Sequence, residues 1–331
     1  MTNRYSFFLC TSILILLSVT FLINYIVNPY GIFDNNRFPI KNHIYSERMT
    51  KFYYASRSEF DNILIGSSRI GVFNPQKLKP YLSHKTYNMS LDGASIFEEY
   101  SYIEYFTRTK NIDTIILGLD FFSFNSTLLE KDDFSLERLD NSVYLNDYIK
   151  SLLSYQALKS SFNTISDNYY GAIKKQNFIT GHKTYENQEK NKNNLKMIQS
   201  NINITLKQYK LDPRQGYTSS LKDNVSIKKL LNYVEKIVKL QKMRKFDLKI
   251  YISPIHEKHI DLIYELGFGS HFEFWKTELS KITDYYDFSN KNYITKNIEN
   301  FWDSSHIQEK SVTILFKEMD EENSIFYRKR I

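Results

Sequence analysis

The 331-residue sequence has one cysteine, Cys10, and few residues that interrupt regular structure, with only 10 glycines and 6 prolines. A single cysteine excludes an intramolecular disulfide and any zinc site built from several thiolates. The scarcity of glycine and proline excludes a long flexible linker. Neither sign of charge dominates, since 44 basic and 37 acidic residues leave +7. With 42% hydrophobic and 24% charged residues, the composition is that of a globular protein, which excludes disordered, collagen-like and multi-span membrane chains.

One long apolar run lies near the N-terminus. Residues 7–27 carry no charge, and a helix of that length spans roughly 31 Å, enough to cross the hydrocarbon core. Arg4 precedes the run and the next basic residue is Arg37, so the positive-inside bias predicts a cytoplasmic N-terminus and an exported remainder. A cleaved signal peptide is the alternative, but the run is long for one and no small-residue cleavage site follows. We predict a single-pass anchor of the cytoplasmic (inner) membrane over residues 1–30.

The rest of the chain, residues 31–331, alternates apolar runs with helical spacing. Buried strands are predicted at 60–66, 85–90, 111–120 and 248–254, and helices at 95–108 and 226–245. This alternation predicts an α/β domain with a parallel sheet covered on both faces, facing the periplasm or the extracellular side.

Residues 121–224 break the alternation. We predict a largely helical insertion there, carried by the same domain and not folding separately. Its lysine-rich part, residues 182–205, is typical of a solvated surface, and contact with an anionic polymer or lipid is the alternative.

Three short motifs carry side chains suited to catalysis. Gly66-Ser67-Ser68-Arg69 directly follows a predicted strand, at the sheet edge where open α/β folds bind ligands. Gly93 follows the next strand and lets the backbone N–H approach a ligand closely. Asp303 and His306 stand three residues apart, and an acidic group can orient histidine as a general base toward serine. Taken alone, each motif also fits an ordinary turn or helix cap.

Together and in this order, the motifs resemble those of the SGNH (GDSL-like) hydrolase and acyltransferase superfamily. The resemblance covers residues 60–125 and 246–318. It implies a three-layer α/β/α sandwich around a parallel sheet. It also implies that Ser68 is the nucleophile, that His306 and Asp303 complete the triad, and that the N–H groups of Ser68 and Gly93 form the oxyanion hole. We expect no cofactor and no metal.

The N-terminal span narrows the resemblance to membrane-anchored, exported members that work beside membrane-bound O-acyltransferases, as in alginate O-acetylation and teichoic-acid D-alanylation. This branch implies acyl (most simply acetyl) transfer or ester hydrolysis on an exported polysaccharide or glycan, with a membrane-bound O-acyltransferase as a partner. A non-catalytic accessory or polysaccharide-binding protein of such a system is the alternative.

Two positions depart from the superfamily pattern. Ser67 replaces the usual aspartate of the first block, and Asp120 replaces the asparagine of the third. An ionised carboxylate cannot donate a hydrogen bond, and losing one oxyanion donor costs about 2.7–4 kcal/mol. Either Asp120 has another role, or Asn88 or Asn125 substitutes, or the site is weak.

Further residues are candidates for supporting the site. His256 follows a predicted strand and should lie at the same sheet edge as Ser68, whereas Arg69 could pair with an anionic substrate group or form an exposed salt bridge. His256 and His259 are spaced for chelation but lack a third ligand. Arg214 and Tyr217 lie in a turn-rich stretch that is a candidate cleft loop. No glycine-rich phosphate loop follows a strand and the net charge is modest, so we expect no nucleic acid partner.

Overall fold

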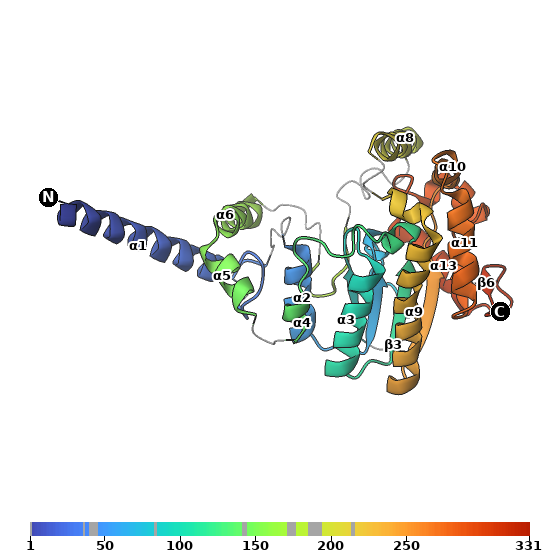
Figure 1. The fold of residues 1–331 in the computed structure, drawn as a ribbon, viewed down its shortest axis with the longest axis horizontal. Coiled ribbons are helices and arrows are strands. Elements are labelled where there is room, and N and C mark those ends of the chain that lie inside the picture. Colours follow the sequence, from blue (N-terminus) through green and yellow to red (C-terminus); the bar gives the residue numbers. More distant parts are fainter. Residues whose placement is uncertain are drawn as a thin grey trace. The chain divides into compact units, whose positions relative to one another are not determined.

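The computed structural model describes residues 2–35, 37–39, 46–82, 85–140, 144–170, 177–184, 194–212 and 216–331. The chain forms two compact units (Figure 1). The first comprises Met1–Arg57 with Asp133–Lys174, and the second comprises Ser58–Asp132 with Lys175–Ile331. The stretch predicted as an insertion, residues 121–224, therefore contributes to both units.

The first unit is helical. It contains α1 (Thr2–Val27), α2 (Glu47–Arg57), α4 (Leu136–Asp140), α5 (Leu145–Leu153) and α6 (Tyr155–Tyr170). Residues Arg4–Val27 of α1 are long enough and apolar enough to cross a membrane, with a mean hydropathy of 2.4. Most of the large apolar side chains of α1 are exposed, as a helix that faces lipid requires. The predicted apolar helix is thus present at the expected place.

The second unit is built on a six-stranded sheet in the order β2-β1-β3-β4-β5-β6. The strands are β1 (Asn62–Gly66), β2 (Thr86–Ser90), β3 (Thr114–Leu119), β4 (Asp247–Ile252), β5 (Tyr285–Asp287) and β6 (Tyr327–Arg328). The first five are parallel and β6 is antiparallel to β5. The predicted α/β class and the four predicted strands are confirmed. The predicted parallel arrangement holds for five strands, and only the edge strand β6 is antiparallel. Neither β5 nor β6 was predicted, because these two short strands form no apolar run.

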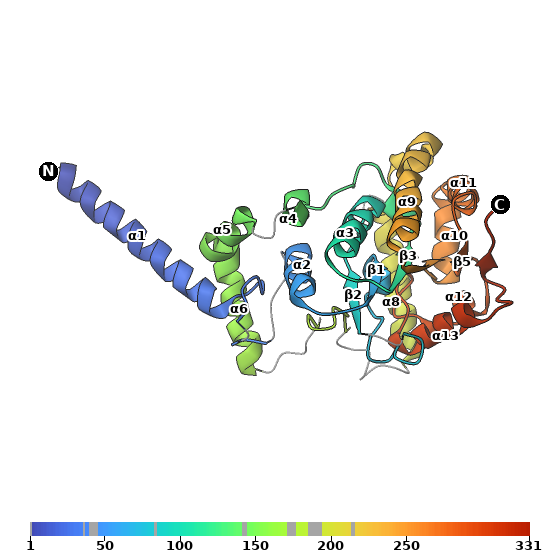
Figure 2. The ribbon, with the colours of Figure 1, turned by 90° about the horizontal axis from the view of Figure 1, so that it is seen from below.

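Helices pack against both faces of this sheet. α3 (Ile96–Thr109) and α9 (Asn224–Arg244) pack on each other and against β1 and β4. On the other face, Leu64, Ile116 and Tyr251 join a buried cluster with α13 (Glu309–Asp320). Figure 2 shows α3 and α9 on one side of the strands and α13 on the other. Because side chains alternate along a strand, residues such as Ile63 and Ile65 face α3 and α9.

The second unit has four further described helices, which are α8 (Leu195–Leu211), α10 (Glu257–Glu265), α11 (Gly269–Ser280) and α12 (Tyr293–Lys296). Of these, α11 packs on α9, and α10 packs on both α11 and α8. The prediction of a solvated surface for residues 182–205 holds only in part, because α8 buries Ile198 and Ile202 and packs on α10. Residues 185–193 of that stretch lie outside the described residues.

Candidate active site

Ser68 lies two residues past the end of β1 and is the first residue of a 3₁₀ helix, Ser68–Ile70, which Ser67 caps. The turn depends on Gly66, whose φ is +155° and where an added Cβ would lie 2.6 Å from the carbonyl oxygen of Gly118. Only glycine fits so close to the neighbouring strand. The chain thereby leaves the sheet abruptly at its carboxyl edge, and Ser68 Oγ lies 2.9 Å from His306 Nε2.

His306 is presented by a loop between η5 (Ile298–Asn300) and α13. The loop is closed by an antiparallel bridge between Phe301 and Ile307. Asp303 Oδ1 accepts the backbone N–H groups of Ser305 and His306 at 2.7 and 2.8 Å, and Asp303 Oδ2 lies 2.9 Å from His306 Nδ1. The structure therefore aligns Ser68, His306 and Asp303 in one hydrogen-bonded row, although 238 residues separate Ser68 from His306.

The charges of the row reinforce one another. Burial opposes ionisation of Asp303, but the His306 ring and the two backbone N–H groups outweigh it and lower the pKa of Asp303. Burial likewise opposes protonation of His306, but the charge and hydrogen bond of Asp303 outweigh it and raise the pKa of His306 above 6.5. Asp303 is thus an anion that favours the imidazolium form of His306.

Gly93 lies in the turn after β2 with a φ of +58°, a left-handed conformation in which glycine carries no strain. Among the residues that the structure describes, the backbone N–H groups of Ser68 and Gly93 donate to no protein acceptor. Both are therefore available to a ligand.

Asp120 lies just past β3 and is buried. Its Oδ1 accepts a hydrogen bond from Arg69 Nη1 at 2.7 Å, and its Oδ2 accepts one from Ser67 Oγ. Arg69 is only 6% exposed, its Nε donates to Ser305 Oγ at 3.0 Å, and its guanidinium lies over the Phe122 ring. The reading of Arg69 as an exposed salt bridge was therefore wrong. This arginine is interior and joins the Ser68 turn to the loop that carries His306.

Asn88 and Asn125 were considered as substitute donors to the oxyanion. Neither side chain is hydrogen-bonded to Ser68 or His306. Asn88 Nδ2 donates to the carbonyl oxygens of Ile70 and Phe73, each at 2.9 Å, so Asn88 shapes the chain after Ser68. Asn125 Oδ1 accepts from Thr218 at 2.9 Å, and its buried Nδ2 has no partner among the described residues.

The predicted His256 caps α10 and accepts from the backbone N–H of Lys258. The backbone N–H of His256 donates to the backbone carbonyl of Ser304. Burial lowers its pKa, so it is a neutral support for the 301–307 loop.

His259 was not predicted as a site residue, but it is buried and lies between Ser304 of the His306 loop and Tyr217. Its Nδ1 lies 2.9 Å from Ser304 Oγ, and its Nε2 lies 3.0 Å from the hydroxyl of Tyr217. Burial first, and then the charge of Arg69, lower its pKa to about 3. Tyr217 thus belongs to the interior of the site, whereas Arg214 lies outside the described residues. Sequence could not reveal the Ser304–His259–Tyr217 chain because serine and tyrosine here follow no motif.

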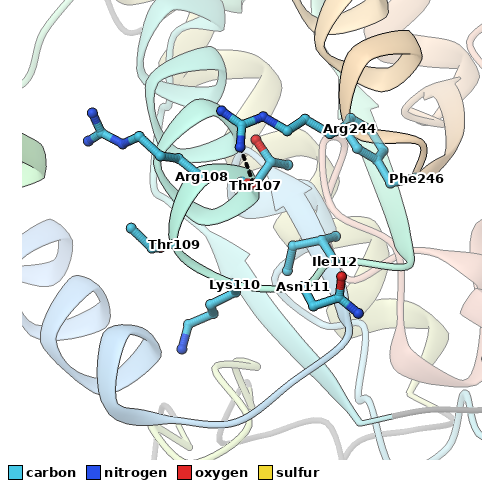
Figure 3. A pocket seen from close by; sticks show the side chains of 8 residues that line it. All are labelled: Thr107, Arg108, Thr109, Lys110, Asn111, Ile112, Arg244 and Phe246. Carbon is cyan, nitrogen blue, oxygen red and sulfur yellow. Dashed lines mark hydrogen bonds between the residues drawn. The ribbon is translucent and has the colours of Figure 1, made fainter.

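Within the described ranges, no group of three or more His, Cys, Asp or Glu side chains is arranged to hold a metal ion. A separate cavity of about 360 Å³ lies at the opposite, amino-terminal edge of the sheet, where Arg108, Lys110 and Arg244 line it (Figure 3). Arg244 is held there by the carbonyl of Thr107 at 3.3 Å. None of the residues predicted for catalysis lines this cavity.

No protein-family model and no curated protein matches this sequence.

Proposed function

We propose that this protein is a serine-dependent acyltransferase or esterase of the SGNH type, anchored in the cytoplasmic membrane and acting on an exported polysaccharide or glycan. The observation that carries the proposal is the Ser68–His306–Asp303 row, with 2.9 Å from Ser68 Oγ to His306 Nε2 and 2.9 Å from His306 Nδ1 to Asp303 Oδ2. Such a row activates serine, because the histidine can take its proton while the carboxylate fixes the ring and stabilises its charge.

In the proposed reaction, Ser68 Oγ attacks the acyl carbonyl and its proton passes to His306 Nε2. The N–H groups of Ser68 and Gly93 receive the oxyanion of the tetrahedral intermediate. Collapse breaks the bond to the leaving oxygen, which takes the proton from His306. A sugar hydroxyl or water then attacks the acyl-serine, His306 removes its proton, and Ser68 is regenerated.

The fold supports the same proposal. A mostly parallel sheet with helices on both faces agrees with the three-layer arrangement of the superfamily, and Ser68 and Gly93 follow adjacent strands at the carboxyl edge. The apolar helix α1 is suited to hold the enzyme at a membrane where surface polymers are made. This arrangement suggests a membrane-bound O-acyltransferase as the partner. That protein would supply acyl groups from the cytoplasmic side of the membrane.

The test uses the full chain in detergent micelles with a fluorophosphonate probe and p-nitrophenyl acetate. We expect labelling and ester hydrolysis that are lost in Ser68→Ala and in His306→Ala but kept in Ser226→Ala, a surface serine in the first turn of α9 that donates a hydrogen bond to Asp223. Absence of labelling in folded wild-type protein would contradict the enzyme and favour the accessory protein. Adding short glycans then separates transfer from hydrolysis, since acylated glycan forms only if a sugar hydroxyl is the acceptor.

A further inference from the structure

Helix α6 of the first unit buries its small side chains. Ala157, Ser160, Ser161 and Thr164 are all 0% exposed. Ser161 Oγ donates to Asn24 Oδ1 of α1 at 2.7 Å, so this face packs against the apolar helix. In a water-soluble domain the buried face of a helix is its large apolar one. Small residues with hydroxyl hydrogen bonds between helices are instead typical of packing within a bilayer.

The large apolar side chains of α6 point outward. Positions 155, 158, 162, 165 and 169 follow each other at intervals of three and four, which places them on one face. Tyr155, Phe162 and Tyr169 on this face are 78%, 57% and 81% exposed. The remaining arc is polar and includes Gln156 and Asn163, of which Gln156 is exposed. The helix therefore has three faces: one on α1, one apolar and largely exposed among the described residues, and one suited to water.

Helix α5 shows the same arrangement, with apolar side chains exposed and polar side chains buried. Leu145, Ile149 and Leu153 are spaced by four residues and are 68%, 48% and 41% exposed. On its buried side, Asp147 accepts from Arg138 Nη2 at 2.9 Å and from the Tyr53 hydroxyl at 3.1 Å. The polar groups are thus paired inside, while the apolar ones keep large parts of their surface exposed in the described structure.

The junction of α5 and α6 lies beside the apolar part of α1. Leu153 lines a groove of about 420 Å³ together with Leu14, Leu17, Phe21 and their neighbours. Phe21 lies six residues before the end of α1, about 9 Å along the helix axis. Asn24 Nδ2 donates to the carbonyl of Leu152 at 3.0 Å, which fixes the junction there. Both views show α6 running across α1 and not alongside it (Figures 1 and 2).

We propose that α5 and α6 lie in the interface of the bilayer beside α1, with their uncovered apolar faces against lipid acyl chains. This inference rests on the membrane span proposed above for α1. At about 24 Å, α6 is too short to cross a bilayer that needs about 20 residues, but its three faces suit a helix lying in the interface. Tyrosines at its ends suit the headgroup level. A second contact would stop the first unit from rotating freely about a single anchor.

The experiment places spin labels on the full chain in vesicles of phosphatidylcholine and phosphatidylglycerol. Cys10, the only cysteine, is exposed on α1 and reports on the span. In a Cys10→Ser background, Phe162→Cys reports on the apolar face of α6, and Gln156→Cys is the matched control on its polar arc. Collisions with oxygen, which concentrates among acyl chains, and with a water-soluble nickel chelate are measured. We expect the oxygen-to-nickel ratio to be several-fold higher at position 162 than at 156.

Each other outcome has a distinct meaning. Equal nickel access at 162 and 156, with the label at Cys10 shielded, would overturn the interfacial helix and leave the span intact. Nickel access at all three positions would overturn the span as well. Shielding of position 162 from both reagents would mean contact with protein, such as a second copy, and would also overturn the proposal. Fluorophosphonate labelling of each variant shows independently that the second unit is folded.

Discussion

Ser67 Oγ donates a hydrogen bond to Asp120 Oδ2, so the two positions at which this chain departs from the SGNH pattern are in direct contact. The second oxygen of Asp120 binds Arg69. The carboxylate therefore acts as an acceptor that ties the exit of β1 to the exit of β3. The proposed oxyanion hole then depends on backbone N–H groups alone.

Asp303→Asn should cripple the proposed enzyme without unfolding it. The amide has nearly the shape of the carboxylate but can donate to His306 Nδ1, which holds the imidazole in the wrong tautomer. We expect hydrolysis of p-nitrophenyl acetate to fall roughly 10⁴-fold, as such a change does in a serine protease triad. Asp320→Asn, a surface carboxylate bound to Lys249, should leave the rate unchanged. A small loss in Asp303→Asn would argue against the triad.

Acylation should depend on pH through His306. Asp303 raises the pKa of His306 above 6.5 despite burial, and only the neutral ring can accept the serine proton. The labelling rate should therefore fall as pH drops, with a midpoint above 6.5. In Asp303→Asn the midpoint should move to lower pH. A pH–rate profile of both proteins checks this, and identical midpoints would contradict it. The paired imidazolium also stabilises the fold at low pH, a contribution lost as pH rises through the raised pKa.

Arg69→Met should destabilise the protein strongly, because it leaves the buried Asp120 carboxylate without its cation. Breaking a buried pair in this way costs about 3–5 kcal/mol. Arg69→Met combined with Asp120→Leu should recover part of the stability, since no charge is left unpaired. It should not restore esterase activity, because the bond to Ser305 is still missing. Thermal unfolding in detergent and ester hydrolysis report the two effects, and Arg328→Met on the surface is the control.

Glu99 should make the fold less stable as pH rises. Its carboxyl oxygens are buried without a partner in the described part of the chain. Burial, followed by the charges of Asp120 and Glu98, raises its pKa well above 4.5. Its stabilising contribution is complete below the unfolded value and is lost as pH rises through the folded pKa. Glu99→Gln should flatten this decline in the unfolding midpoint, whereas the exposed Glu59→Gln should not. Parallel curves for wild type and Glu99→Gln would refute the assignment.

Local pattern alone sufficed for much of the fold. The uncharged run of α1, the apolar runs of β1 to β4 and the spacing of α9 depend on near neighbours in the chain, since burial of a strand or of one helix face imposes its own periodicity. The same holds for the ends of β1 and β2, after which Ser68 and Gly93 follow within three residues. Their place at the carboxyl edge follows from the parallel sheet.

Tertiary structure decided what lies between distant segments. Arg69 could be read equally as a surface cation, and only the order β1-β3 of neighbouring strands brings it to Asp120. Sequence likewise did not show which face of α6 is buried. The hydrogen bond from Ser161 to Asn24 identifies the face that packs on α1, and so the face that points outward. Sequence thus determined which side chains stand at the end of each element, because that depends on local spacing. The sheet order and helix packing determined which of them meet, because such contacts join residues far apart in the chain.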